Sequence, residues 1–176
     1  MMRDLATFNK TLVAKGRPII EIGIGINSGE MSVGNMGSEQ RFDYTVMGDH
    51  VNLGSRLEGI NKQYKTNIIV SEYTYEMIKD SYTCRLLDSV RVKGKKLPVT
   101  IYELIGPKVE DEFINLSKKA ISLYHAREWD NAIAIFNELK SQRDDYLSDI
   151  YIERCNVYKN NPPSEDWDGA YIMTTK

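Results

Sequence analysis

Asn52 and Arg56 form the pair of residues in this sequence that is best suited to chemistry. They lie within residues 41–58, which predict a short strand over residues 42–47, a turn at Gly48 and then a helix. On a helix, residues four apart project from the same face. An apolar stripe runs beside this face, at Leu53, Leu57, Ile60 and Tyr64. The helix can therefore bury the stripe while it presents an amide beside a guanidinium, a pairing suited to a ribose and a phosphate.

The spacing of the two residues alone is more often that of a solvated helix face. The longer string around them favours a specific interpretation. The sequence DYTV-x-GD-x-VNL-x-SRLE, preceded by GIGIN-x-GE-x-x-VGN-x-GS, closely resembles the second half of the class III nucleotide cyclase catalytic domain. The resemblance covers about residues 18–105, with several separate motifs in the family's order. It implies formation of cyclic AMP or cyclic GMP from the nucleoside triphosphate, with release of pyrophosphate.

The resemblance also implies roles for individual residues. Arg56 matches the arginine that stabilises charge on the reacting phosphate, and Asn52 matches the asparagine that holds the ribose. Lys93 most nearly matches the lysine that reaches the triphosphate, with Lys95 as the alternative. Thr45 falls where the family reads the purine, and its hydroxyl can both donate and accept a hydrogen bond. The likeness to bacterial adenylate cyclases favours ATP, while GTP stays open.

The family uses a divalent metal, Mg²⁺ or Mn²⁺, held by two aspartates upstream of the segment resembled here. Neither aspartate motif occurs in this sequence, and Asp43 and Asp49 do not match the metal ligands. We interpret Asp49 as the N-cap of the following helix. The resemblance therefore implies an N-terminally incomplete cyclase domain, without its own metal ligands and poorly active alone.

The resemblance to class III cyclases also implies a head-to-tail dimer. In such a dimer, metal carboxylates of one subunit face the asparagine and arginine of the other. We therefore expect a homodimer or pairing with another cyclase chain, since a sheet that lacks its first strands exposes an edge and an apolar face. The alternative is a non-catalytic half-domain that pairs with a complete cyclase and regulates it.

Strands and helices alternate around the Asn52–Arg56 segment. Residues 3–15 predict an amphipathic helix packed on the next segment of the chain. Residues 19–27 and 31–36 predict the two strands of a hairpin, and the glycines inside the first strand predict a close approach by another backbone or a ligand. Further strands are predicted over residues 67–70, 82–92 and 98–104, and a helix that Ser71 caps through about Lys79. This mixture predicts an α+β fold, and the resemblance implies the ferredoxin-like cyclase fold.

A helical region follows Gly106-Pro107. Apolar spacing predicts helices over residues 112–126, 128–140 and 146–158. We therefore divide the chain into a cyclase domain, residues 1–106, and a helical extension with an irregular tail, residues 107–176. Four residues of this region resemble parts of a tetratricopeptide helix pair: Tyr124, Trp129, Ala132 and Phe136. Because one such unit cannot bury its own apolar face, we expect the extension to dock on the cyclase domain or on a partner.

Composition excludes several other classes of function. The formal net charge of −2 gives no support for nucleic-acid binding. Cys84 and Cys155 are too few and too distant to suggest a disulfide framework, and His50 and His125 lack metal-ligand spacing. Without a long apolar run or a signal-like start, the expected location is cytoplasmic, with membrane anchoring through upstream segments left open.

Overall fold

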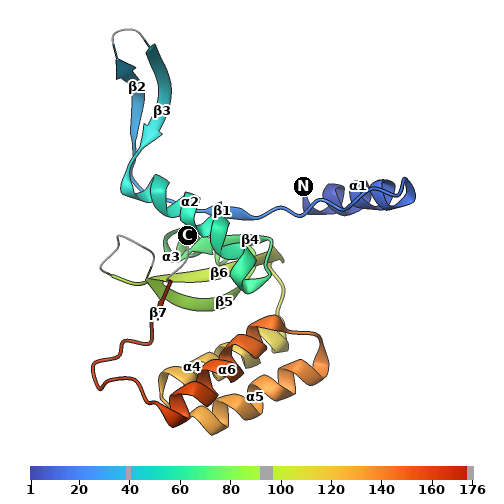
Figure 1. The fold of residues 1–176 in the computed structure, drawn as a ribbon, viewed down its shortest axis with the longest axis vertical. Coiled ribbons are helices and arrows are strands. Elements are labelled where there is room, and N and C mark those ends of the chain that lie inside the picture. The colour runs from blue at the N-terminus through green and yellow to red at the C-terminus, as the bar shows by residue number, and fades with distance from the viewer. Residues whose placement is uncertain (39–40, 92–96, 174–176) are drawn as a thin grey trace.

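A computed structural model describes residues 1–38, 41–91 and 97–173, and Figure 1 shows its fold. The elements are α1 (Met2–Ala14), β1 (Ile24–Ile26), β2 (Ser32–Ser38), β3 (Arg41–Met47), α2 (Asp49–Tyr64), β4 (Ile68–Ser71), α3 (Glu72–Ile78), β5 (Tyr82–Arg91), β6 (Val99–Pro107), α4 (Glu112–His125), α5 (Trp129–Gln142), α6 (Tyr146–Asn160) and β7 (Tyr171–Ile172). The predicted α+β architecture, with helices after the sheet, is confirmed.

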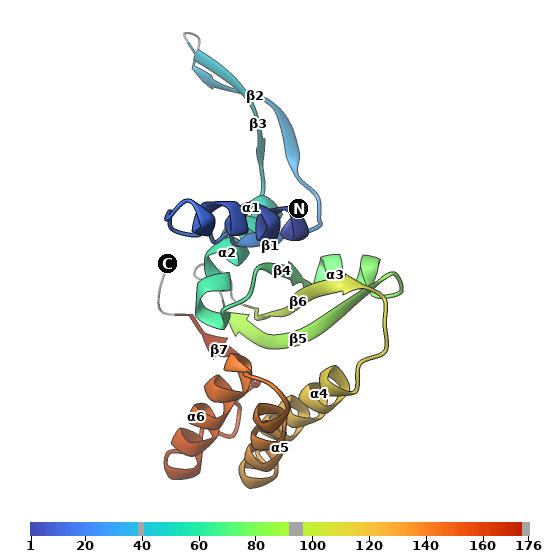
Figure 2. The same cartoon turned by 90° about the vertical axis from the view of Figure 1, so that its right-hand side faces the viewer.

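The central sheet has five strands in the order β1-β4-β6-β5-β7. β1 runs parallel to β4, β6 runs antiparallel to both β4 and β5, and β7 runs parallel to β5. A separate antiparallel hairpin, β2–β3, projects from the body, and the helices α4–α6 lie at the opposite end (Figures 1 and 2). The sheet and α2 thus lie between a projecting hairpin and a helical bundle.

The predicted hairpin between residues 19–27 and 31–36 is wrong. Only Ile24–Ile26 form a strand there, and this strand pairs with β4 rather than with the next segment. The hairpin partner of β2 is β3, with Val33 opposite Val46. The alternating isoleucines indicate a strand with two unlike faces, but alternation does not say which strand lies beside it.

The first helix is confirmed, and its packing on the next segment of the chain is only partial. α1 has no buried residue, and Phe8 and Val13 are 50% and 61% exposed. Figure 1 shows α1 projecting to one side of the sheet, joined to β1 by an extended segment. Asn9 ties it to the chain through hydrogen bonds with the backbone N–H and C=O of Ile20, each 2.9 Å. The described residues thus cover the apolar stripe of α1 only in part, since Leu5 and Leu12 are half-buried while Phe8 and Val13 stay exposed.

One continuous cluster of buried side chains runs from α2 and the sheet into the helical segment. The predicted stripe of α2 is buried throughout, at Leu53, Leu57, Ile60 and Tyr64. At the other end, Tyr124 and Phe136 each pack against the ring of Tyr151. The predicted helical extension therefore shares its core with the sheet, and its likeness to a tetratricopeptide pair stays a prediction. Among the described residues, no helix combines the length and the apolar character needed to cross a membrane.

Candidate active-site helix

α2, which carries Asn52 and Arg56, rests directly on the backbone of β1. A Cβ added to Gly25 would lie 2.3 Å from the Glu58 nitrogen and 2.4 Å from the Gly54 oxygen. These distances are too short for any side chain, so only glycine allows the helix to come this close. The predicted close approach is confirmed, and the approaching group is the backbone of α2. Gly25 therefore sets the height of α2 above the sheet.

Replacing Gly25 by alanine is expected to destabilise the protein by about 1–3 kcal/mol, because the added methyl group forces α2 away from β1. The matched control is Gly59→Ala on α2 itself, where an added Cβ meets nothing within 4 Å. That change is expected to stabilise by about 0.5–1 kcal/mol, since alanine is the better helix former. Urea unfolding of both variants measures the difference. Equal changes in unfolding free energy for the two variants would contradict the inference that Gly25 allows the close contact between β1 and α2.

Asn27, at the end of β1, holds the first turn of α2. Its amide nitrogen donates to the carbonyl oxygen of His50 at 2.9 Å, and its amide oxygen accepts from the Ser71 hydroxyl at 2.5 Å. Ser71 in turn caps α3, as predicted, by accepting from the backbone N–H of Thr74. This role of Asn27 was not predicted from the sequence, although an asparagine that follows a strand just before a Ser-Gly turn is a usable signal.

The first turn of α2 differs from the prediction in its cap. The N-cap residue is Gly48, and no side chain caps the helix there. Gly48 has φ +155°, a conformation that a residue with a side chain rarely adopts. The prediction that Asp49 is the N-cap is therefore wrong. Asp49 is the first helical residue, where its negative charge still suits the positive end of the helix.

Asn52 and Arg56 lie one turn apart on α2, as the spacing predicts. Asn52 is exposed and Arg56 is half-buried. Within the described parts of the chain, neither side chain makes a hydrogen bond or an ion pair. The buried stripe at Leu53 and Leu57 fixes the rotation of the helix, so the amide and the guanidinium are both available to a ligand.

Of the other predicted site residues, Thr45 lies in the described part of the chain. Thr45 is exposed on β3, opposite Gly34 in the projecting hairpin. Lys93 and Lys95 lie outside the described residues. Among the described residues, the structure thus places Asn52 and Arg56 together on one face of α2, and Thr45 on the projecting hairpin.

The carboxylates near the same helix are too scattered to form a metal site. In the described ranges, no group of three or more His, Cys, Asp or Glu side chains lies close enough together to hold a metal ion. Asp43 lies on β3 and Asp49 begins α2. The described residues therefore do not fit the divalent metal that the family implies.

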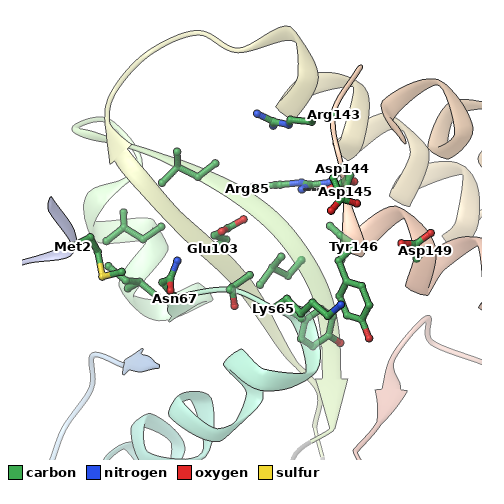
Figure 3. Close-up of a pocket in the computed structure, with 17 residues that line it drawn as sticks. Met2, Lys65, Asn67, Arg85, Glu103, Arg143, Asp144, Asp145, Tyr146 and Asp149 are labelled. Carbon is green, nitrogen blue, oxygen red and sulfur yellow. Dashed lines mark hydrogen bonds and ion pairs between the residues drawn. The ribbon is translucent and has the colours of Figure 1, made fainter. Parts of the chain in front are cut away.

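A cavity of about 590 Å³ lies elsewhere, between the sheet and the turn before α6 (Figure 3). It is lined by Arg85, whose guanidinium donates to both carboxylate oxygens of Asp145 at 2.6 and 2.7 Å and to the Ser117 hydroxyl at 3.0 Å. Glu103 also faces this cavity, and burial raises the pKa of its carboxyl. Asn52, Arg56 and Thr45, the predicted site residues that the structure describes, do not line it, and the cavity belongs to the junction between sheet and helices.

Comparison with known proteins gives a family match over the first part of the chain. A family model described as adenylate and guanylate cyclase catalytic domain matches residues 1–106. The chain is 36% identical over 146 residues to the terminal-differentiation-specific adenylate cyclase of Dictyostelium discoideum, covering 77% of this chain and 7% of that protein. It is 45% identical over 92 residues to an adenylate cyclase of Anabaena cylindrica, covering 51% and 18%. The chain thus spans less than a fifth of these relatives.

Solved structures of cyclases resemble the fold. The adenylyl cyclase CyaB from P. aeruginosa aligns with a TM-score of 0.54 at 37% identity, covering 60% of this chain and 54% of that one. The guanylyl cyclase Cya2 aligns with a TM-score of 0.51 at 39% identity, covering 59% and 52%. The family match of 106 out of 176 residues is 60% of the chain. Because the Dictyostelium match covers 77%, it continues into the helical segment.

Proposed function

Because this chain belongs to the family of adenylate and guanylate cyclase catalytic domains, we propose that α2 provides the ribose- and phosphate-binding half of a nucleotide cyclase site. The proposed reaction converts ATP to cyclic AMP and pyrophosphate. The observation that carries this proposal is the pair Asn52 and Arg56 on α2. Asn52 is exposed, Arg56 is half-buried, and neither side chain has a partner among the described residues. Gly25 fixes the helix that carries them.

The proposed chemistry is attack by the ribose 3′-oxygen on the α-phosphorus. The bond from the α-phosphorus to the bridging oxygen breaks, and pyrophosphate leaves with the electron pair. Negative charge increases on the phosphoryl oxygens, and the Arg56 guanidinium is placed to stabilise it. The Asn52 amide holds the ribose and orients the attacking oxygen. In this proposal Thr45 contacts the purine, and Lys93, or else Lys95, contacts the triphosphate.

ATP is the proposed substrate. The curated relatives from Dictyostelium, Rhizobium meliloti and Anabaena are all named adenylate cyclases. The two solved structures include one adenylyl and one guanylyl cyclase, so the fold serves both nucleotides. GTP is therefore the competing substrate that any activity assay must include.

We further propose that the metal-binding carboxylates come from outside these 176 residues, on a partner cyclase chain. Two exposed features support such pairing. In the described sheet, β1 pairs only with β4, which leaves its other edge open. The hairpin carries Phe42, Tyr44 and Val46 at alternating positions, hence on one face, and they are 63%, 76% and 41% exposed. An apolar face of this kind is typical of an interaction surface.

The test is an assay in which two chains must share one site, here called the paired assay. This chain is mixed with a cyclase catalytic domain whose own counterparts of Asn52 and Arg56 are alanine. With Mn²⁺, ATP or GTP, each component alone is expected to form little product, and the mixture is expected to form cyclic AMP. Sedimentation of the mixture measures association independently of activity.

The outcomes separate the two candidate functions. Cyclic AMP from the mixture supports the shared site. If this chain instead associates with an intact cyclase and changes its activity, but does not restore the alanine variant, the regulatory half-domain is supported. The open β1 edge and the hairpin also allow that function. The absence of both association and product would rule out both functions.

A further inference from the structure

The C-terminal end of α2 and the helical segment α4–α6 both donate hydrogen bonds to the same buried carboxylate. The hydroxyl of Tyr64, the last residue of α2, donates to Oδ2 of Asp88 on β5 at 2.5 Å. Arg154 of α6 donates to the same oxygen through Nη1 at 2.6 Å and approaches the Tyr64 hydroxyl through Nη2 at 3.4 Å. Asp88 is completely buried, so α2, the sheet and α6 meet at one carboxylate.

The remaining partners fix the orientation of that carboxylate. Its Oδ1 accepts from the backbone N–H of Ser89 at 2.8 Å and from the Tyr151 hydroxyl at 3.3 Å. Tyr151 also donates to the carbonyl oxygen of Leu87 at 2.9 Å. A buried charge is tolerated only when it is paired and hydrogen-bonded, and Arg154 supplies the opposite charge. Burial, followed by the charge of Asp88, raises the pKa of Tyr64, so its hydroxyl stays protonated as a donor.

Two further contacts join the same regions. The Lys65 ammonium lies over the ring of Tyr146, the first residue of α6, 3.8 Å from its centroid. Arg85 of β5 binds Asp145, whose side chain also caps α6 by accepting from the backbone N–H of Ser148. Figure 3 shows Lys65 beside Tyr146 and Arg85 directed at Asp145. The N-terminal end and the middle of α6 are therefore both held against the sheet and the end of α2.

A continuous helix connects these bonds to the proposed site. With a rise of about 1.5 Å per residue, Arg56 lies about 12 Å and Asn52 about 18 Å along the axis from Tyr64. Gly25 holds α2 in the middle, Asn27 holds its first turn, and Tyr64 holds its last. A shift at one end of such a rod changes the tilt of the whole helix. Displacements near 1 Å at reacting groups are large enough to change rates about 100-fold.

We infer that Tyr64, Asp88 and Arg154 are positioning residues for Asn52 and Arg56, through which the helical segment α4–α6 sets the placement of the catalytic helix. The catalytic part of this inference rests on the proposed function. The structural part, that the last turn of α2 is held by the helical segment through Asp88, does not.

The test compares two substitutions, each of which removes one tyrosine hydroxyl that donates to the Asp88 carboxylate. Tyr64→Phe cuts the bond to α2 but leaves Asp88 its bonds to Arg154, Tyr151 and Ser89. Tyr151→Phe, the matched control, removes a hydroxyl on α6 and leaves the Tyr64 bond intact. Hydrogen exchange of the full chain is measured at backbone amides of α2 and of α5 in both variants. Tyr64→Phe is expected to lower protection in α2 by about 10- to 100-fold relative to α5, as for the loss of a hydrogen bond to a charged group.

In Tyr151→Phe, protection in α2 and α5 is expected to change together. Equal losses in α2 and α5 for Tyr64→Phe, or no loss in either, would overturn the structural part of the inference. The paired assay then tests the catalytic part. There Tyr64→Phe is expected to lower kcat about tenfold or more with a smaller change in the KM for ATP, because positioning acts on the transition state. Tyr151→Phe, which keeps the Tyr64 bond, is expected to lower kcat less than Tyr64→Phe does.

Equal kcat in Tyr64→Phe and the unchanged chain would overturn the catalytic part while the proposed function stands. If the unchanged chain forms no product in the paired assay, the proposed function fails and with it the catalytic part. Hydrogen exchange then still decides whether Asp88 joins α2 to the helical segment.

Discussion

Replacing Arg56 by alanine is expected to lower the rate of cyclic AMP formation in the paired assay by about 100- to 1,000-fold, the effect of removing one donor that stabilises charge in a transition state. The loss is expected in kcat and kcat/KM alike, because the arginine acts most strongly on charge that develops during the reaction. Arg56→Lys is expected to recover only part of the rate, since an ammonium keeps the charge but not the planar fork of donors.

The stability of the Arg56 variants provides the internal check. Arg56 is half-buried and makes no hydrogen bond or ion pair with the described residues, so its replacement is expected to change the free energy of unfolding by less than about 0.5 kcal/mol. Lys62→Ala, an exposed basic residue in the last turn of the same helix, is the matched control for a lost positive charge. An equal loss of activity in Lys62→Ala would indicate general attraction of the nucleotide, and full activity in Arg56→Ala would exclude the proposed role.

The placement of Asn52 and Arg56 could be predicted because it depends on local sequence. A helix at this position requires only the 3.6-residue period, and the apolar stripe at Leu53 and Leu57 determines which face turns outward. Gly25 was also informative, because a glycine inside a strand signals close approach even when the approaching element is unknown. Thr45, by contrast, could be assigned to a strand but not to a hairpin standing clear of the sheet, because the pairing of strands is not a local property.

The bonds that hold the last turn of α2 could not be predicted from the sequence. Asp88 bonds Tyr64 and Arg154, which are 24 and 66 residues away in the chain. Asp88 is ordinary in its local pattern, since a charged residue in a strand usually indicates a solvent-exposed face. Only the packing of the helices against β5 shows that Asp88 is completely buried. The same holds for α1, whose amphipathic pattern predicts a packed stripe of which the described structure leaves Phe8 and Val13 exposed.

The buried pair of Arg85 and Asp145 is expected to give the largest effect on stability. Asp145→Ala leaves the Arg85 guanidinium buried without its counter-charge and removes the cap of α6, and is expected to destabilise the protein by about 3–5 kcal/mol. This is a large share of the roughly 5–15 kcal/mol that stabilises a protein. Asp130→Ala, which breaks the exposed pair of Asp130 with Lys159 on α6, is the control and is expected to cost less than about 1 kcal/mol.

The pH dependence of the same variant distinguishes a charge effect from a simple loss of packing. Burial alone would raise the pKa of Asp145, but the hydrogen bonds and charge of Arg85, with bonds from Ser148, lower it below its ordinary value of 3.8. A carboxyl whose pKa is lowered on folding stabilises the protein fully above its unfolded pKa, and this stabilisation is lost as pH falls through the folded pKa. The difference in unfolding free energy between the unchanged chain and Asp145→Ala is therefore expected to be constant from about pH 5 to 8 and to shrink below about pH 4. Urea unfolding at pH 7 and pH 3 measures it. A difference that stays the same at both values would mean that Asp145 stabilises the junction of sheet and helices by its shape rather than by its charge.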